Sequence, residues 1–325
     1  MRLADAGQAA RRARDLLRAD TIIVADSGNW QIGVPAVTAS LRGLVDATVE
    51  VRVLDHGLHS GTFGGPALDA LTLLARLIAT FHDDDGKVAV AGLPAADNPG
   101  AGISEEQFRA DSRMRPGARL AGSGSIASRL WTQPALSVIG LDAPVVAVAS
   151  NTLLPAASAK VSLRIAPGTD PARAMEALRR HVQANAPFGA GISFTPGAMT
   201  ATFAADISAD AARSALWVMK QAWGVDPVAA GVGGSIPVVS EFAGRFPQAQ
   251  VLITDAEDPD SRAPEPNESI HVGDFRNAIL AEALLWARIN NPARRQTRAG
   301  RQPTAPGAGP SPHQAGPRST GPAPG

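Results

Sequence analysis

Two side chains in the sequence stand where acid–base or metal chemistry could take place. His59 lies in a glycine-rich loop after a predicted strand, where its ring is free to titrate or to stabilise a developing oxyanion. Asp26 follows the apolar run 21–25, at the carboxyl end of a predicted buried strand, where α/β sheets place ligand-binding groups. An ordinary turn histidine is the alternative for His59, and an Asx turn is the alternative for Asp26.

Two further features are suited to binding an anion. Arg164 lies inside the apolar run 159–165, and a guanidinium can hold a carboxylate through two parallel hydrogen bonds. The alternative is that this side chain points to solvent from the polar face of a strand. Residues 231–237 form a glycine-rich segment, and its backbone N–H groups could hold a carboxylate or a phosphate. The segment lacks the lysine of a P-loop and the pattern of a nucleophile elbow, so the residues leave the anion open.

Two other patterns are less specific. Residues 122–127 loosely match a dinucleotide-binding fingerprint, but no apolar strand precedes them, which argues against such a site. The segment 255–268 is rich in carboxylates that could bind a hard metal ion. A solvated acidic loop is the more usual explanation of that segment.

Composition excludes several classes of protein. The chain has 325 residues and no cysteine, which removes disulfide scaffolds, thiolate zinc sites, iron–sulfur clusters and cysteine nucleophiles. Aromatic residues make up 4%, and the formal net charge is zero, so neither a base-stacking surface nor a polyanionic partner is indicated. No apolar run approaches the roughly 18 residues of a membrane span, and residues 1–20 have no signal-peptide pattern. We therefore expect a cytoplasmic protein that binds neither nucleic acid nor membrane.

Hydrophobic patterning predicts an α/β fold in which one domain is split by another. Towards both ends of the chain, buried strands accompany amphipathic helices: strands 21–25 and 250–254, with helices near 9–19, 211–223 and 275–289. The middle of the chain follows the strand–helix–strand–strand–helix–strand order of a ferredoxin-like α+β layer. Its predicted elements are strands 44–54, 87–90, 145–149, 159–165 and 191–195, and helices 67–82, 104–113 and 170–184.

The segment 291–325 differs from the rest of the chain. It contains eight Pro, six Gly and five Arg, with no acidic residue and no apolar periodicity. Such a segment buries too little surface to offset its chain entropy, so we predict a disordered tail.

Several short motifs then fall into one known order. They are Asp26 after the run 22–24, Ser40-Leu41-Arg42-Gly43, Leu58-His59-Ser60-Gly61, Asn151 with Pro155, Leu163-Arg164-Ile165, Gly233-Gly234-Ser235-Ile236-Pro237, and Asn267-Glu268. In this order and spacing the chain resembles the di-zinc metallopeptidase family of carboxypeptidase G and aminoacylase. Within that family it looks most like the carnosinase-type dipeptidases.

The resemblance implies a fold and a set of roles. The fold is a partial zinc-peptidase α/β domain with an inserted ferredoxin-like lid that makes a homodimer. It divides the chain into a remnant of the peptidase domain (1–43), a lid or dimerisation domain (44–203), the C-terminal half of the peptidase domain (204–290) and the tail. Asp26 would be a zinc ligand, and His59 would stabilise the oxyanion in the partner's site. The substrate, a dipeptide or an N-acyl amino acid, would be held by Asn151, Arg164, Gly234 and Ser235.

The chain also departs from the family pattern. The family's His-x-Asp zinc motif and its Glu pair, which supplies the general base, lie upstream of the position of Asp26, and residues 1–25 contain neither. Pro264 stands where the family has its last zinc-binding His, and Glu265 is a poor substitute. Because a di-zinc site needs about three protein ligands for each metal ion, we predict that zinc binding and hydrolysis are defective.

Three hypotheses follow from these residues. The first is an N-terminally truncated dipeptidase-family hydrolase that is inactive on its own. The second is a non-catalytic dimerisation or regulatory subunit that donates His59 to an intact paralogue. The third is a binding module for small carboxylates, built on Arg164, Asn151 and the 231–237 segment.

Overall fold

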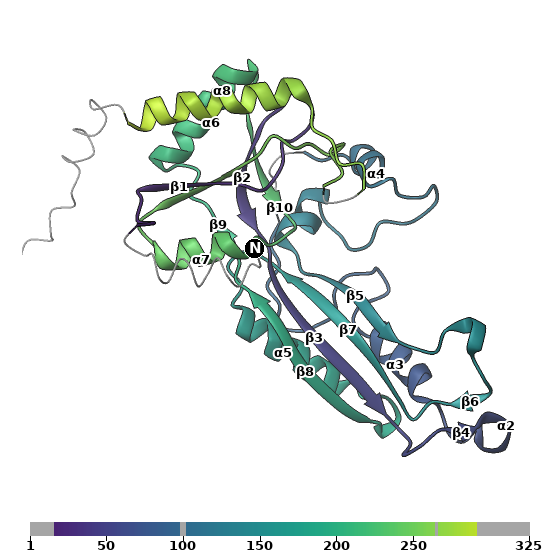
Figure 1. Cartoon of the computed structure of the whole chain (residues 1–325). Helices are drawn as coiled ribbons and strands as arrows, with labels where there is room; N and C mark the ends of the chain where they lie inside the picture. Colours follow the sequence, from purple (N-terminus) through teal and green to yellow (C-terminus); the bar gives the residue numbers. More distant parts are fainter. Residues whose placement is uncertain (1–15, 98–101, 264–265, 291–325) are drawn as a thin grey trace, which may run out of the picture.

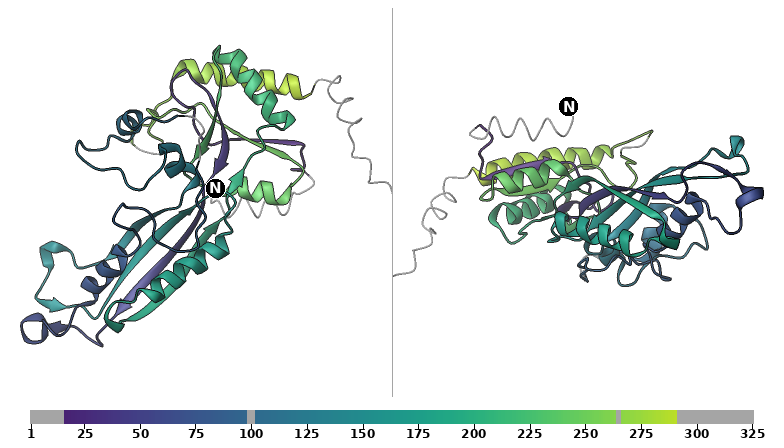
Figure 2. Two further views of the ribbon diagram at one scale, coloured as in Figure 1. Left: turned by 180° about the vertical axis from the view of Figure 1, so that it is seen from behind. Right: turned by 90° about the horizontal axis from the view of Figure 1, so that it is seen from below.

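The fold has two parts that extend away from each other. The computed structural model describes residues 16–97, 102–263 and 266–290. In Figure 1 a base of short strands and helices carries a long lid that projects from it as an arm, and Figure 2 shows the same arrangement from two other directions. Residues 9–15 of the predicted helix 9–19 fall outside the described residues, and residues 16–19 form a turn and irregular backbone instead of a helix. The predicted tail 291–325 falls entirely outside the described residues.

The lid is a four-stranded antiparallel sheet with two helices on one face. The strands follow the order β5-β7-β3-β8, with bounds β3 (Gly43–Arg52), β5 (Ala135–Asp142), β7 (Ala156–Ile165) and β8 (Gly191–Thr200). Helices α3 (Ala70–Ala79) and α5 (Pro171–Ala184) pack their apolar faces on the alternate buried residues of β3 and β7. This is the ferredoxin-like layer that the sequence predicts.

Two predicted strands of the lid are wrong. Residues 87–90 contribute a single bridge, Val88 to His82, in the turn after α3. Residues 145–149 contain the short 3₁₀ turn η2 (Val146–Val148), and Val146 is 92% exposed. The second strand of the layer is instead β5, which the sequence analysis does not predict. Apolar residues alone do not make a strand, because a strand also needs a neighbour to take its backbone hydrogen bonds.

The base contains two small sheets with helices on both sides. β1 (Thr21–Ala25) pairs in parallel with β11 (Gln250–Thr254), while β2 (Ala36–Leu41) lies between β10 (Val228–Val232) and β9 (Phe203–Ala204). Helices α6 (Asp210–Trp223) and α8 (Val272–Ile289) pack together over one face. Helix α7 (Pro237–Arg245) packs on the other face, where Val251 and Ile253 contact a separate apolar cluster.

The remaining elements are short. A two-stranded ribbon of β4 (Leu58–His59) and β6 (Thr152–Leu153), with the short helix α2 (Ser60–Phe63), forms the outer end of the lid. Helix α4 (Glu105–Ser112) and the short turns η1 (Ser128–Thr132) and η3 (Pro187–Gly189) complete the described structure. Within the described ranges, no helix has both the length and the hydropathy that a membrane span requires.

The chain passes from base to lid at a single residue, Arg42. β2 ends at Leu41 and β3 begins at Gly43. A Cβ on Gly43 would lie 2.7 Å from the Thr200 carbonyl oxygen and 2.8 Å from Ile165 Cγ1, so this position has no room for a side chain. The two sheets therefore meet at a tightly packed junction, and this junction fixes the position of Arg42.

Candidate functional site

The register of the lid sheet brings Arg164 to the junction with the base. Ile165 pairs with Gly43, the first residue of β3, and Arg164 pairs with Leu44. Leu163 and Ile165 are buried in the lid core, and side chains alternate along a strand, so Arg164 points away from that core. Arg164 is half-buried.

Arg164 contacts the glycine-rich segment of the base. Its Nη1 donates a hydrogen bond to Ser235 Oγ over 2.9 Å. Gly233, Gly234 and Ser235 connect β10 to α7, so the backbone N–H groups at the start of α7 lie on the same loop. The structure thus brings together three of the residues that the resemblance assigns to substrate: Arg164, Gly234 and Ser235.

A second arginine at this place has no role in the sequence analysis beyond its motif. Arg42 is 8% exposed, and its guanidinium donates to three backbone carbonyls. Nε binds Gly233 O at 2.9 Å, and Nη1 binds Gln133 O at 3.2 Å and Arg129 O at 3.4 Å. Contacts to backbone carbonyls leave no pattern in the sequence, so only the three-dimensional structure identifies Arg42 as part of the site.

The two arginines carry positive charge that no nearby acid neutralises. Among the residues that the structure describes, no carboxylate oxygen lies within 4.0 Å of either guanidinium. Burial, and then the charge of Arg164, lowers the pKa of Arg42 to about 10. Two cations next to a glycine-rich loop are suited to holding an anion such as a carboxylate.

His59 and Asn151 lie together at the other end of the lid. β4 and β6 pair His59 with Thr152, and the Ser60 backbone N–H donates to the Asn151 carbonyl over 2.9 Å. Both side chains are exposed, and His59 Nδ1 accepts a hydrogen bond from the Gly61 N–H at 3.2 Å. From Ala156 to Arg164, β7 spans about 26 Å at about 3.3 Å per residue. One chain therefore does not bring His59 and Asn151 to Arg164.

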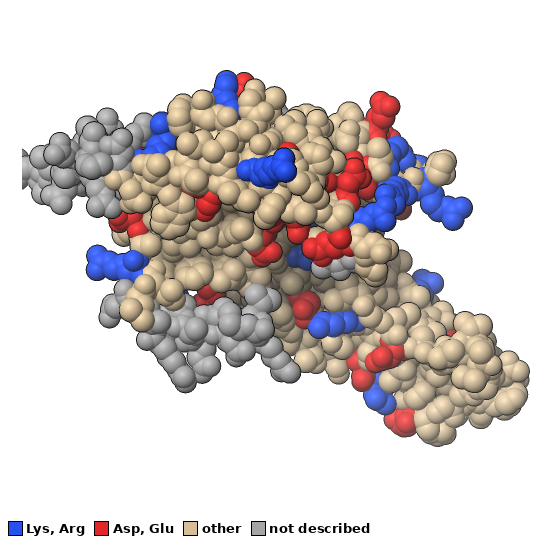
Figure 3. Space-filling model, turned by 45° about the horizontal axis from the view of Figure 1, so that its top comes forward, with Lys and Arg blue, Asp and Glu red and all other residues tan. Residues whose placement is uncertain are grey.

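Asp26 lies on the base, after β1, next to the acidic segment that begins at Asp255. The Asp26 N–H donates to the Thr254 carbonyl, and the Ser27 N–H donates to Asp255 Oδ2 at 2.9 Å. Burial, then the charge of Asp255, raises the pKa of Asp26. Burial also raises the pKa of Glu257, followed by the charge of Asp255 and of the surrounding acids Glu268, Asp26 and Asp258. In Figure 3 acidic side chains border the hollow between base and lid.

The comparisons with known proteins agree with this arrangement. Residues 39–190 match the family model described as the peptidase dimerisation domain. The chain is 30% identical over 273 residues to the cysteinylglycine-S-conjugate dipeptidase of Corynebacterium striatum, covering 83% of this chain and 60% of that protein. Residues 39–190 thus match the dimerisation domain of M20 peptidases, and the chain as a whole is similar to M20 metallopeptidases.

Solved structures show the same fold. The di-peptidase Dug1p of Saccharomyces cerevisiae superposes with a TM-score of 0.74 at 21% identity, covering 88% of this chain and 63% of that one. The M20 family metallo-carboxypeptidase Sso-CP2 of Sulfolobus solfataricus gives a TM-score of 0.68 at 20% identity, over 86% and 65%. The chain thus spans about 60% of the length of these M20 relatives.

The donors around Asp26 do not fit the zinc centre that similarity to M20 metallopeptidases implies. In the described ranges, no three His, Cys, Asp or Glu side chains converge so that they could hold a metal ion. The neighbouring acids serve as turn acceptors instead: Asp255 also accepts the Ala256 N–H, and Asp258 accepts the Asp260 N–H. Pro264 and Glu265, the residues at the position of the family's last zinc ligand, lie outside the described residues.

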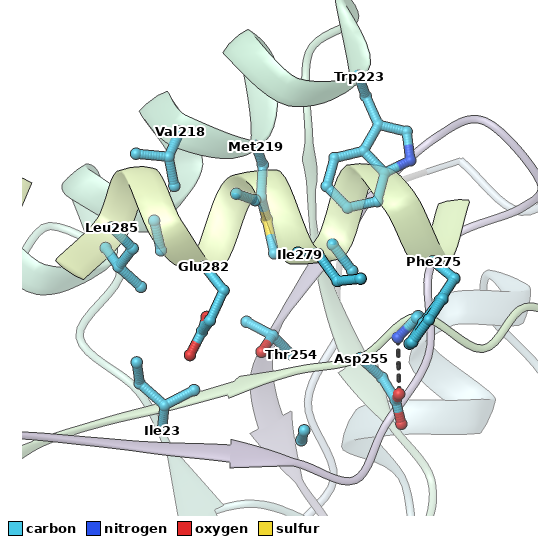
Figure 4. Close-up of a pocket in the computed structure, with 15 residues that line it drawn as sticks. Ile23, Val218, Met219, Trp223, Thr254, Asp255, Phe275, Ile279, Glu282 and Leu285 are labelled. Atoms are coloured by element: carbon cyan, nitrogen blue, oxygen red, sulfur yellow. Dashed lines mark hydrogen bonds between the residues drawn. The ribbon is translucent and has the colours of Figure 1, made fainter. Parts of the chain in front are cut away.

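A second concave surface lies on the base, beneath helix α8. It is a cavity of about 280 Å³ between α6, α8 and the β1–β11 pair, and Figure 4 shows Met219, Trp223 and Ile279 around it. Glu282 points into this largely apolar space, which Asp255 and Thr254 also line, and burial raises its pKa. Neither arginine of the junction lines the cavity, so it is separate from the junction of base and lid.

The raised pKa of Glu257 predicts how stability depends on pH. A carboxyl group whose pKa is higher in the folded state than in the unfolded state binds its proton more tightly when folded. Stability is then highest at acidic pH and falls as pH rises through the folded pKa. We expect Glu257→Gln to raise the unfolding midpoint in denaturant at about pH 7 and to leave it unchanged near pH 4, which weakens the pH dependence.

Glu106→Gln, at an exposed position of α4, provides the control and should leave the same pH profile unaltered. Equal midpoints for wild type and Glu257→Gln at neutral pH would show that burial and the neighbouring acids do not raise the pKa of Glu257 enough to affect stability.

Proposed function

We propose that this chain is the substrate-carboxylate-binding and dimerising part of an M20 dipeptidase, and that on its own it does not hydrolyse peptides. The observation that carries the proposal is the junction of base and lid. There Arg164 contacts Ser235, and Arg42 lies beside it with no described carboxylate near either guanidinium. This charge is suited to the C-terminal carboxylate of a dipeptide or of an N-acyl amino acid.

Each group at the junction has a separate task in binding. Arg164 is half-buried and has one hydrogen bond to Ser235, so its remaining N–H groups can donate to the two oxygens of a carboxylate. Ser235 orients the guanidinium, and the space beside its neighbour Gly234 is open, since a Cβ there would meet its nearest atom, Val232 Cγ1, only at 3.7 Å. The N-terminus of α7, which begins at Pro237, adds a favourable dipole.

The names of the M20 relatives support the substrate class. They are a cysteinylglycine-S-conjugate dipeptidase and, in yeast, a Cys-Gly metallodipeptidase, both named for dipeptides that end in a free carboxylate. A zinc centre would supply water activation in such an enzyme. We assign no such step to this chain, because the described acids around Asp26 do not provide the ligands for it.

Homodimer formation through the lid is part of the proposal. The edge strand β5 and the loop after it expose apolar side chains that a monomer would normally bury: Val138, Ile139, Leu141, Val145, Val146 and Val148. Exposed apolar patches and unpaired edge strands commonly mark interfaces. This patch falls within the residues that match the peptidase dimerisation domain.

Ligand binding tests the carboxylate site directly. Glycylglycine should bind and should raise the melting temperature, whereas glycylglycinamide, which lacks only the carboxylate, should bind at least about tenfold more weakly. Arg164→Met should remove that difference, because the charged hydrogen bonds are lost. Both affinities can be measured by NMR titration.

Arg173→Met, at an exposed arginine of α5, controls for the loss of a positive charge elsewhere. Equal affinity for the acid and the amide in wild type would contradict the proposed site.

Metal content and turnover test the second half of the proposal. We expect less than about 0.2 zinc per purified chain by elemental analysis, because one well-placed carboxylate does not hold Zn²⁺. The same sample should show no hydrolysis of glycyl or alanyl dipeptides with zinc added. Near two zinc ions per chain, or real turnover, would mean that neighbouring acids rebuild a metal site.

The position of His59 favours a second candidate function, that of a subunit donating a histidine to another chain. His59 and Asn151 project together from the outer end of the lid, far from their own Arg164. If they serve a partner's site, this chain should restore activity to a full-length M20 dipeptidase in which the corresponding lid histidine has been substituted. His59→Ala in this chain should abolish the rescue, while His56→Ala, at an exposed histidine nearby, should not. No rescue by the wild-type chain would eliminate this function.

A further inference from the structure

Arg42 occupies an unusual place in the chain. It is the single residue between β2 of the base and β3 of the lid, and the neighbouring Gly43 leaves no room for adjustment on that side. A guanidinium at this point can bind both units of the fold at once.

The contacts of Arg42 join two segments that are distant in sequence. Nε binds the carbonyl of Gly233 in the base, and Nη1 binds the carbonyls of Arg129 and Gln133, which flank the turn leading to β5 of the lid. Only a planar group with donors pointing in several directions can make these contacts together. A lysine would keep the charge but would present it at one point.

The glycines of the loop allow this close approach. A Cβ on Gly233 would lie 2.7 Å from Arg42 Nη2 and 2.9 Å from the Leu130 carbonyl oxygen. A Cβ on Gly231 would lie 2.5 Å from Trp131 Cγ. The loop before Ser235 is therefore pressed against the turn η1, with the Arg42 guanidinium between them.

We propose that Arg42 is a positioning residue that fixes the loop Gly233–Ser235 against η1, so that Ser235 meets Arg164 and the carboxylate site is assembled. This inference rests on the proposed function, because the assembled site is the carboxylate site described above. Arg42 acts through the loop, because its Nε and Nη1 are committed to the backbone carbonyls that hold the loop against η1.

The electrostatics of the pair agree with this role. A buried cation next to another cation is unfavourable, and the lowered pKa of Arg42 reflects both burial and the charge of Arg164. The fold keeps this arrangement without a described counter-ion. A bound carboxylate on Arg164 would relieve the repulsion, which ties loop position and ligand binding together.

The test compares two substitutions that disturb the same contact from opposite sides. Arg42→Lys keeps the charge and removes the fork, while Gly233→Ala inserts a Cβ into the space of the guanidinium. Both should weaken glycylglycine binding by at least about tenfold and bring it close to that of glycylglycinamide. Gly233→Ala also serves if Arg42→Lys does not fold.

Two matched variants serve as controls. The Arg109 side chain, on α4, also binds a backbone carbonyl, that of Ala118, so Arg109→Lys should bind glycylglycine like wild type. Gly244→Ala, in α7, places a Cβ in open space and should also have no effect.

A spectroscopic signal separates positioning from general loss of stability. In protein labelled with 5-fluorotryptophan, the ¹⁹F resonance of Trp131 can be assigned by Trp131→Phe. Without ligand, Arg42→Lys should shift that resonance and leave the resonance of Trp286, on α8, in place. The unfolding midpoint of Arg42→Lys in denaturant should stay close to that of wild type, while its affinity for glycylglycine falls.

The outcomes distinguish the two proposals. If wild type prefers glycylglycine to its amide and Arg42→Lys binds like wild type with an unmoved Trp131 signal, Arg42 is not a positioning residue. If wild type shows no preference for the carboxylate, the proposed function fails. In that case, a shifted Trp131 resonance in Arg42→Lys still supports the proposal that Arg42 positions the loop. An unshifted resonance overturns that proposal.

Discussion

The pairing of β3 with β7 sets the geometry of everything else in the molecule. Ten consecutive residues of each strand are paired, from Gly43 with Ile165 to Arg52 with Ala156. One end of this ladder delivers Arg164 to the base, and the other end carries the ribbon with His59 and Asn151. A one-residue shift in the register of β7 would turn Arg164 into the lid core and expose Leu163. The packing of α3 and α5 on the apolar face of the sheet disfavours such a shift.

Sequence patterning captured the parts of the fold in which apolar periodicity and pairing coincide. Strands β1, β3, β7 and β11, and helices α5, α6 and α8, lie close to where the pattern predicts them. It failed at 145–149, where three exposed valines have no partner strand, and at β5, whose pairing with β7 depends on a distant segment. The ferredoxin-like order survived because β5 takes the place of the strand predicted at 87–90.

The candidate site shows the same division between local and non-local information. The types of Arg164, Ser235 and Asp26 suggest their chemistry, and the contact between Arg164 and Ser235 agrees with it. Arg42 gave no such signal, because its partners are carbonyl groups that every residue possesses. The distance between Asn151 and Arg164 also depends on the whole length of β7, which the sequence does not reveal until the register is known.

The separation of the two ends of the lid has a consequence for how such a protein would behave in solution. Where a carboxylate at Arg164 and an imidazole from a second copy serve one ligand, the complete site exists only while two chains are associated. Dilution would then empty the sites without altering a single residue, and the fraction of complete sites would follow the law of mass action. The apolar patch on β5 and the following loop would in this way set the working concentration of the protein.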